Sequence, residues 1–395
     1  MARLSQWLDE RRRSGSLREL RPVERLGNGR IRLANHPDSP PLLDFSSNDY
    51  LALSEHPSLI ESGQQALAEF GAGSGAARLM SGDLTVHHRL EEAVADLKNK
   101  EAALLFGSGF MANAGVIPAL VGRGDSVYID RLDHASIYDG CQLSGAKLHR
   151  FRHNDLAHLE ELLQKNPSTG ETLAVVESVY SMDGDRCPLL DLVALKKRYN
   201  FTLLVDEAHA TGLFGPNGGG LVEAEGVGED VDLVMGTFGK ALGSYGAYLA
   251  GSQEMIDYLI NRARSFIYST ALPPSVVAAS LKAVELVRES SQLRDDLWQR
   301  VDMFKKLLRE GGLEADLGQT QIVPITVGAS DRALQMAEAL QKRGIFATAV
   351  RPPTVPENTA RLRFSVTRHL DEAQLAEGAE SLLAVVKEFA PELLG

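Results

Sequence analysis

The chain has 395 residues and a formal net charge of −12, from 53 Asp and Glu against 41 Lys and Arg, an acidic balance that argues against nucleic-acid binding. Because Cys141 and Cys187 lie far apart and in no Cys-x-x-Cys spacing, we expect neither a disulfide framework nor a zinc or other metal site. The N-terminus lacks a secretory signal and no apolar run approaches the roughly 18 residues of a membrane span, which predicts a cytoplasmic protein without a membrane partner.

The chain divides into three predicted parts. Residues 1–45 read as a short amphipathic helix, with Leu4, Trp7 and Leu8 on one face, followed by an irregular segment. Residues 46–285 form the predicted large domain, which opens with a run that contains Asn48. Residues 286–395 form a predicted C-terminal α+β domain that begins with long helical patterns.

Strand and helix patterns alternate from about residue 100 to residue 250. Short, largely apolar runs, such as 102–106, 127–130, 173–177 and 201–205, are typical of buried strands. This alternation indicates βαβ units, and therefore an α/β fold with a mostly parallel sheet.

The first of these strands precedes Gly107-Ser-Gly109-Phe-Met-Ala112, which opens a predicted helix. This is the Gly-x-Gly-x-x-Ala pattern of dinucleotide-binding folds, and Asp130 lies about 20 residues on, where such folds place the ribose-binding acid. An NAD-dependent dehydrogenase is therefore one interpretation. The other is a single phosphate, because the same backbone amides at a helix N-terminus can hold it.

Asp206 and Lys240 favour the single phosphate. Asp206 follows the strand-like run 201–205, and Lys240 lies among glycines after the run 231–235. Ligands of open α/β sheets bind at such strand tips. A phosphate loop is excluded, because Val234 and Ala241 stand where its glycine and its Ser or Thr are needed. A lysine and an aspartate at strand tips can form the Schiff base and protonate the ring of pyridoxal phosphate.

Three motifs in this order carry a family resemblance: Asp206-Glu-Ala-His209, Thr237-Phe-Gly-Lys240, and Arg351-Pro-Pro-Thr354-Val-Pro. From about residue 17 to residue 375 the chain resembles the α-oxoamine synthases. The resemblance implies the aminotransferase-like fold of type I pyridoxal 5'-phosphate enzymes, a homodimer with shared active sites, and decarboxylative condensation of an amino acid with an acyl thioester.

The resemblance also implies roles around the cofactor. Lys240 would form the Schiff base, Asp206 would hold the proton of the pyridine nitrogen, His134 would stack on the ring, and His209 would donate a hydrogen bond to the ring oxygen. The remaining cofactor contacts implied are Gly109, Phe110, Ser181 and Thr237, with Ser269 and Thr270 completing the phosphate site of the neighbouring subunit.

Four further residues match substrate-binding positions of the family. Arg363 would bind the amino-acid carboxylate, and Asn48, Arg18 and Thr354 are the other implied contacts, with Arg18 a better match than Arg21. Ala77 and Leu79 depart from the Ser or Thr and the His that flank the family's glycine-rich-loop arginine. The run 351–363 resembles members that join L-alanine to a pimeloyl thioester, carried by CoA or a carrier protein. Members that join glycine to acetyl-CoA are the alternative.

Overall fold

The computed structural model describes residues 2–13, 17–35 and 38–395. It has two compact units, a small one of residues 1–50, 182–185 and 296–395 and a large one of residues 51–181 and 186–295. None of the helices in the described ranges has the length and apolar character that crossing a bilayer requires.

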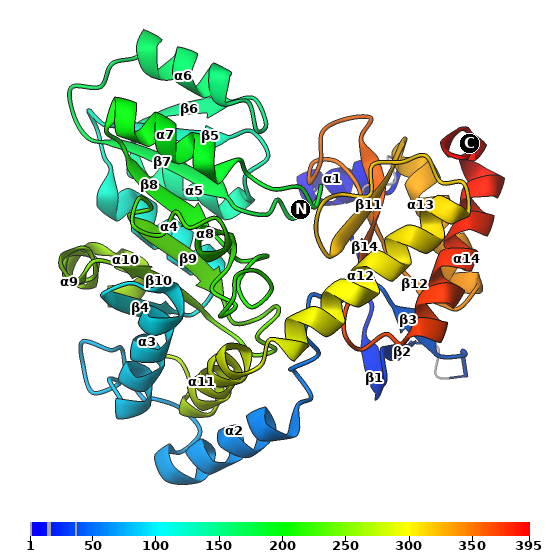
Figure 1. Ribbon diagram of the computed structural model, residues 1–395, viewed down its shortest axis with the longest axis horizontal. Coiled ribbons are helices and arrows are strands. Elements are labelled where there is room, and N and C mark those ends of the chain that lie inside the picture. The colour runs from blue at the N-terminus through cyan, green and yellow to red at the C-terminus, as the bar shows by residue number, and fades with distance from the viewer. Residues whose placement is uncertain (1, 14–16, 36–37) are drawn as a thin grey trace. The chain divides into compact units, whose positions relative to one another are not determined.

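The large unit alternates strands and helices along the chain (Figure 1). Its elements are α2 (Pro57–Phe70), α3 (Thr85–Lys98), β4 (Ala102–Phe106), α4 (Gly109–Leu120), β5 (Ser126–Asp130), α5 (Ala135–Ser144), β6 (Lys147–Phe151), α6 (Leu156–Lys165), β7 (Thr172–Glu177), α7 (Leu189–Tyr199), β8 (Thr202–Asp206), α8 (Leu221–Ala224), β9 (Leu233–Thr237), β10 (Ala247–Gly251), α9 (Gln253–Arg262), α10 (Arg264–Ile267) and α11 (Pro274–Glu289).

One sheet organises this unit, with strand order β4–β10–β9–β8–β7–β5–β6. The pairs β6–β5, β5–β7, β7–β8 and β8–β9 are parallel, and only β10 runs antiparallel to its neighbours β9 and β4. The predicted α/β class with a mostly parallel sheet is therefore confirmed. Helices cover both faces of a parallel sheet, which explains why its strands read as continuous apolar runs.

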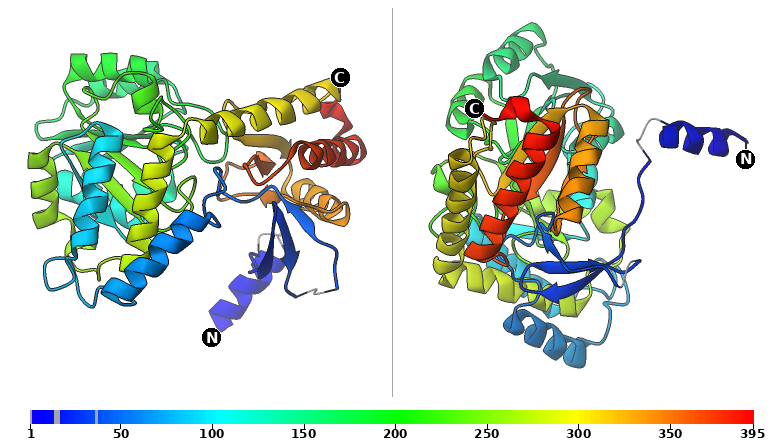
Figure 2. Two further views of the ribbon diagram at one scale, coloured as in Figure 1. Left: turned by 60° about the horizontal axis from the view of Figure 1, so that its bottom comes forward. Right: turned by 90° about the vertical axis from the view of Figure 1, so that its right-hand side faces the viewer.

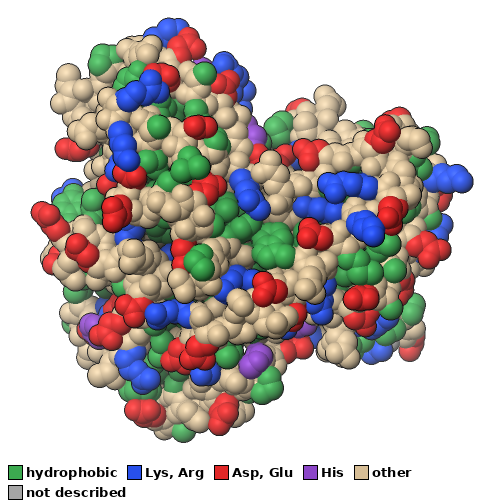
Figure 3. Space-filling model, in the orientation of Figure 1, with side chains coloured by type: hydrophobic (Ala, Val, Ile, Leu, Met, Phe, Trp, Pro, Cys, Tyr) green, Lys and Arg blue, Asp and Glu red, His purple; other side chains and the backbone are tan. Residues whose placement is uncertain are grey.

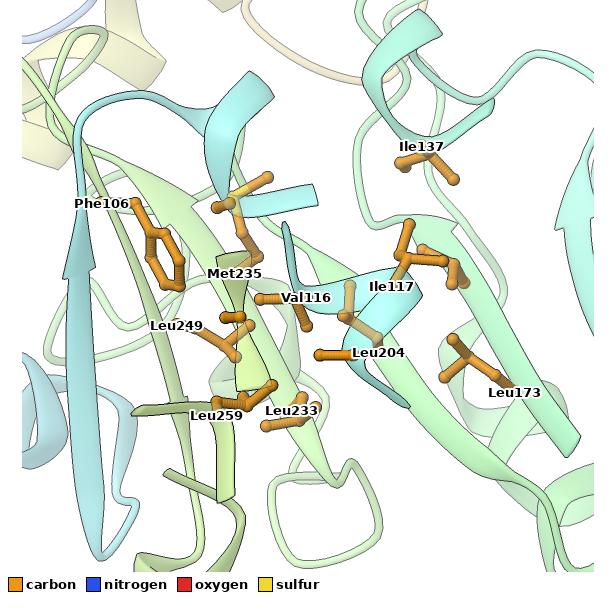
Figure 4. Close-up of a cluster of buried hydrophobic side chains, with 14 of the residues drawn as sticks. Phe106, Val116, Ile117, Ile137, Leu173, Leu204, Leu233, Met235, Leu249 and Leu259 are labelled. Carbon is orange, nitrogen blue, oxygen red and sulfur yellow. The ribbon is translucent and has the colours of Figure 1, made fainter. Parts of the chain in front are cut away.

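A large hydrophobic core lies between this sheet and the helices on one of its faces (Figure 4). Val116 and Ile117 of α4 pack there against Leu204 and Leu249 of the strands, and all four are fully buried. Burying such side chains contributes about 1.5–3 kcal/mol each relative to exposure. The core thereby fixes the beginning of α4, at Gly109, relative to the strand ends.

The small unit is built from the two ends of the chain. Its elements are α1 (Ala2–Arg13), β1 (Val23–Gly27), β2 (Arg30–Leu33), β3 (Leu42–Asp44), most of α12 (Gln292–Glu310), β11 (Ile322–Gly328), α13 (Ser330–Lys342), β12 (Ile345–Phe346), β13 (Thr348–Val350), β14 (Ala360–Ser365), α14 (Glu372–Phe389) and the 3₁₀ turn Pro391–Leu393. Its sheets have the orders β1–β2–β3–β12 and β11–β14–β13. Helix α13 packs against the second sheet, and α14 lies beside α13 (Figure 2, right).

The segment before residue 45 differs from the prediction, because strands replace much of the expected irregular stretch. Asn28 and Gly29 have φ of 50° and 68° and join β1 to β2 in a tight hairpin, a conformation that Asn-Gly favours. Parallel pairing of β3 with β12 then joins this segment to the C-terminal third. Because such long-range pairing leaves no local signal, the sequence did not predict that the two ends of the chain fold together. The domain boundaries proposed from the sequence, at 45/46 and 285/286, stay a prediction.

Candidate active site

Most strands of the large sheet end at one edge. Strands β4, β5, β7, β8 and β9 run in the same direction, so their last residues lie along this edge. Four of those residues are polar: Asp130, Glu177, Asp206 and Thr237. The structure therefore brings the predicted Asp206 and Thr237 to the carboxyl edge of neighbouring strands, where α/β sheets bind ligands.

Asp206 is buried, with 4% of its surface exposed, and its carboxylate is held from two sides. Its Oδ1 accepts a hydrogen bond from the Ala208 amide at 2.9 Å, and its Oδ2 accepts one from the Asn113 amide nitrogen at 3.1 Å. Asn113 was missed by the sequence analysis, although it is the single polar side chain of the helix Gly109–Leu120. Two donors fix the orientation of this carboxyl group.

His134 caps the N-terminus of α5. Its Nδ1 lies 2.8 Å from the Ser136 hydroxyl and accepts from the Ser136 amide at 3.2 Å. Burial lowers the pKa of His134; the Asp206 charge raises it and the Lys240 charge lowers it further. The ring is therefore neutral near pH 7 and held by one edge, which leaves its faces suited to stacking.

Glu177 is a second carboxyl group beside Asp206. It is paired with Asp206 in the register of β7 and β8, and its Oε1 accepts the His134 amide at 2.5 Å. Burial and the charge of Asp206 raise the pKa of Glu177 well above its usual range. Glu177 was not identified from the sequence, because a glutamate at a strand end has no pattern that distinguishes a site residue from a solvated one.

Gly109 and Thr237 lie close together at the start of α4. A Cβ added to Gly109 would lie 2.9 Å from the Thr237 methyl carbon, so only glycine fits this approach. The Thr237 hydroxyl is buried, and the described residues offer it no hydrogen-bond partner. A buried hydroxyl of this kind needs an acceptor or donor, and a phosphate oxygen at a helix N-terminus would provide one.

The other predicted cofactor residues occupy neighbouring positions in the large unit. Lys240 is half-buried, three residues beyond β9, and its charge acts on His134 and Glu177. Ser181 and His209 are buried just beyond β7 and β8, and Phe110 is 48% exposed at the first turn of α4.

Ser269 and Thr270 line a small pocket with Gly107, Arg78 and His87. Thr270 also forms a backbone bridge with Ala77. Ala77, which replaces the Ser or Thr of the family pattern, therefore lies in a stretch that pairs through its main chain. Arg78 donates two hydrogen bonds of 2.9 Å to Glu91 and is thereby tied into the fold.

The small unit contains a separate group of polar residues around β14. Arg363 is 7% exposed and donates to Asn48 Oδ1 at 3.3 Å, to the Ser365 hydroxyl at 2.8 Å and to the Tyr50 hydroxyl at 3.2 Å. Arg361, on the same face of the strand, forms an ion pair with Asp183. Both arginines are buried, so this face of the strand is not solvated.

Arg18 and Thr354 also meet in the small unit. The Arg18 guanidinium donates to the Thr354 hydroxyl at 2.9 Å although 336 positions separate them. Burial and the nearby charge of Arg18 lower the pKa of Arg351. The structure thus joins two predicted substrate residues and adds a second cation, Arg351, near Arg18.

The family model described as aminotransferase class I and II matches residues 40–382. The chain belongs to this family. Within it, the 8-amino-7-oxononanoate synthase of Citrifermentans bemidjiense is 46% identical over 98% of this chain and 99% of that protein. The family resemblance predicted from the motifs is confirmed, and the dinucleotide-binding interpretation is wrong.

Two solved structures agree with this family assignment. A serine palmitoyltransferase variant from S. paucimobilis with a bound PLP–myriocin aldimine matches with a TM-score of 0.91 and 30% identity, over 98% of both chains. An 8-amino-7-oxononanoate synthase from Francisella tularensis matches with a TM-score of 0.75 and 29% identity, over 88% of this chain and 98% of that one. The predicted type I fold is confirmed.

Proposed function

We propose that this chain condenses L-alanine with a pimeloyl thioester to 8-amino-7-oxononanoate, a step of biotin biosynthesis, with pyridoxal 5'-phosphate as cofactor. Identity of 46% along almost the whole of a synthase with this name carries the proposal. In the reaction, a carbon–carbon bond forms between the alanine Cα and the thioester carbonyl carbon, the carbon–sulfur bond breaks to release the thiol, and the alanine carboxylate leaves as carbon dioxide.

The residues at the sheet edge fit this cofactor. Thr237 would offer its hydroxyl to the phosphate, Gly109 leaves room beside it, and the carboxylate of Asp206 would accept a hydrogen bond from a protonated pyridine nitrogen. When bound, pyridoxal phosphate supplies an electron-accepting ring and an aldehyde that reacts with amines. Gly109, Phe110, Ser181 and Thr237 would hold it, with Lys240 as the amine that attaches to it.

Protein side chains carry out the binding and proton transfer. With the cofactor bound, Asp206 would keep the proton on the ring nitrogen, neutral His134 would stack on the ring, and His209 would donate a hydrogen bond to the ring oxygen. Lys240 takes the α-proton of alanine on its Nζ. Arg363 binds the alanine carboxylate through parallel N–H donors, and its hydrogen bonds to Asn48 and Tyr50 hold the guanidinium in place.

Arg18 and Thr354 are proposed to bind the acyl donor, whose far carboxylate, free or esterified, lies at the end of a long apolar chain. A homodimer in which Ser269 and Thr270 complete the partner's phosphate site is part of the proposal, supported by the family resemblance. On the face in Figure 3, acidic and basic side chains are interspersed, which suits small-molecule substrates better than nucleic acid.

A panel of amino acids and acyl thioesters, scored by thiol release from purified protein, tests the proposal. Alanine with pimeloyl-CoA or a pimeloyl carrier protein should give the highest kcat/KM. Faster release from glycine with acetyl-CoA would assign the chain to that activity instead. No release with any pair would overturn the proposal.

A further inference from the structure

Glu207 lies between Asp206 and His209 but takes no part in the chemistry proposed above. Its side chain is fully buried, and its Oε2 accepts a hydrogen bond of 2.7 Å from the Lys98 amine. Lys98 ends helix α3, and only 2% of its side chain is exposed. A fully buried ion pair therefore anchors the residue that joins two predicted cofactor contacts.

The same amine ties together several parts of the large unit. Lys98 also donates to the Thr211 hydroxyl at 2.9 Å and to the Gly219 carbonyl. The Thr211 hydroxyl lies 2.7 Å from the hydroxyl of Tyr248, on β10. These contacts join α3, the turn after β8, the loop before α8 and strand β10 around one charge.

Glu207 contributes its own contacts to this arrangement. Its Oε1 accepts the amide of Val222 at 2.9 Å, at the first turn of α8. Its carbonyl accepts the amides of Ala210 and Thr211, both at 2.9 Å, which closes the turn that carries His209. The glutamate is thus held at its backbone and at both carboxylate oxygens.

Glycines next to the ion pair and its contacts leave room for these side chains. A Cβ at Gly220 would lie 2.3 Å from a carboxylate oxygen of Glu207, and one at Gly236 would lie 2.2 Å from the Tyr248 hydroxyl. A buried ion pair of this kind adds little net stability, because desolvation of both charges offsets their attraction. Its specific effect is geometric, since each hydrogen bond restricts where the turn can lie.

We propose that Lys98 and Glu207 are positioning residues that hold the turn 206–211, so that Asp206 and His209 keep the geometry the cofactor requires. Their role in the reaction rests on the proposed function, whereas their effect on the turn does not. Neither residue touches a reacting atom.

Four proteins test this proposal: the wild type, Lys98→Met, Glu207→Gln and the double variant. Each single change leaves a buried group without its partner and should lower Tm. The double variant removes both charges, so its Tm should return close to the wild-type value. It still lacks the bonds from Lys98 to Thr211 and Gly219.

Two measurements on the double variant separate positioning from simple stabilisation. In cofactor-free protein, the amides of Ala208, Ala210 and Thr211 should exchange with solvent about tenfold faster than in the wild type, as the loss of one hydrogen bond to a charged group implies. The dissociation constant of pyridoxal phosphate, from an absorbance titration, should rise by about the same factor. The matched control is Lys165→Met with Glu161→Gln, an exposed ion pair on α6, which should change neither quantity.

Recovery of Tm with fast exchange and weak cofactor binding supports the proposal. The proposal is overturned if Tm, amide exchange and cofactor binding of the double variant all return to wild-type values. It is also overturned if the turn of the single variants exchanges as slowly as in the wild type. Wild-type protein that fails to bind pyridoxal phosphate would instead overturn the proposed function, and the exchange comparison would still decide whether the pair holds the turn.

Discussion

The two units arrange their polar residues in different ways. In the large unit, Asp206 and Thr237 end neighbouring parallel strands, so the sheet topology alone brings them to one edge. In the small unit, Arg363 lies within β14, and its contacts Asn48 and Tyr50 come from 315 and 313 positions earlier in the chain. The first arrangement follows from local sequence patterns and from the rule that parallel strands end at the same edge of their sheet. The second depends on how distant segments of the chain pack.

This difference implies different consequences of mutation. Changes at the sheet edge should affect the cofactor and the rate of the chemical step. Changes in the small unit should affect the Michaelis constants of individual substrates. Variants in each unit can test this division.

Replacing Lys240 by alanine should abolish turnover, because no other group would supply both the amine that attaches to the cofactor and the base for the α-proton. Borohydride reduction followed by mass spectrometry should attach the cofactor to the Lys240 peptide of the wild type and to no peptide of the variant. Lys165→Ala, an exposed change on α6, is the control. Wild-type turnover in Lys240→Ala would refute the assignment of the whole sheet edge.

Asp206→Asn should keep the fold and lose most of kcat. An amide cannot hold the proton of the pyridine nitrogen, and losing such a charge-assisted interaction costs about 2–4 kcal/mol, or roughly 30- to 1000-fold in rate. Stopped assays with alanine and pimeloyl-CoA measure the change. Asp230→Asn, in an exposed ion pair with Lys197, serves as control. A kcat within a fewfold of wild type would contradict the role of Asp206.

Arg363→Lys should raise the KM for alanine about 10- to 100-fold, because lysine cannot form two parallel hydrogen bonds to a carboxylate. Arg361→Lys is the matched change on the same strand face. Since Arg361 binds Asp183 within the protein, that variant should lower Tm and leave the KM for alanine nearly unchanged. Equal effects of both changes on KM would show that β14 acts only through folding.

Arg18→Ala should raise the KM for the pimeloyl thioester about fivefold and leave the KM for alanine alone. The side chain is exposed, and exposed charge interactions are weak, about 1 kcal/mol or less. Both constants are needed: equal effects on the two substrates, or none on either, would remove Arg18 from the acyl site. Thr354→Val, which removes the hydroxyl that Arg18 contacts, should give a smaller change in the same direction.

Glu177→Gln should change activity least and instead alter how stability depends on pH. Because the pKa of Glu177 is raised in the folded protein, its contribution to stability is present below its usual pKa and is lost as the pH rises through the folded value. Glutamine keeps an acceptor for the His134 amide and does not titrate. The Tm difference between variant and wild type, measured without cofactor, should therefore shift in favour of the variant from pH 5 to pH 8; a constant difference would contradict the shift.

Much of the large unit was predictable from sequence. Runs such as Leu203-Leu204-Val205 identify buried strands, and a strand end followed by Asp206 or Lys240 identifies ligand-facing positions through the geometry of parallel sheets. Asn113 and Glu177 were not identified, because their role depends on which atoms they meet across the sheet edge. The roles assigned to individual residues, Lys240 and Arg363 included, remain predictions.

The sequence by itself determined the fold class, the family and the strand ends that carry Asp206 and Thr237, because apolar periodicity and short motifs are local properties of the chain. Only the tertiary structure decided that Lys98 anchors Glu207, that Arg18 meets Thr354, and that residues 1–50 fold with the C-terminal third. These contacts join positions separated by 109 and 336 residues. They form only when the whole chain packs, so no local pattern could specify them.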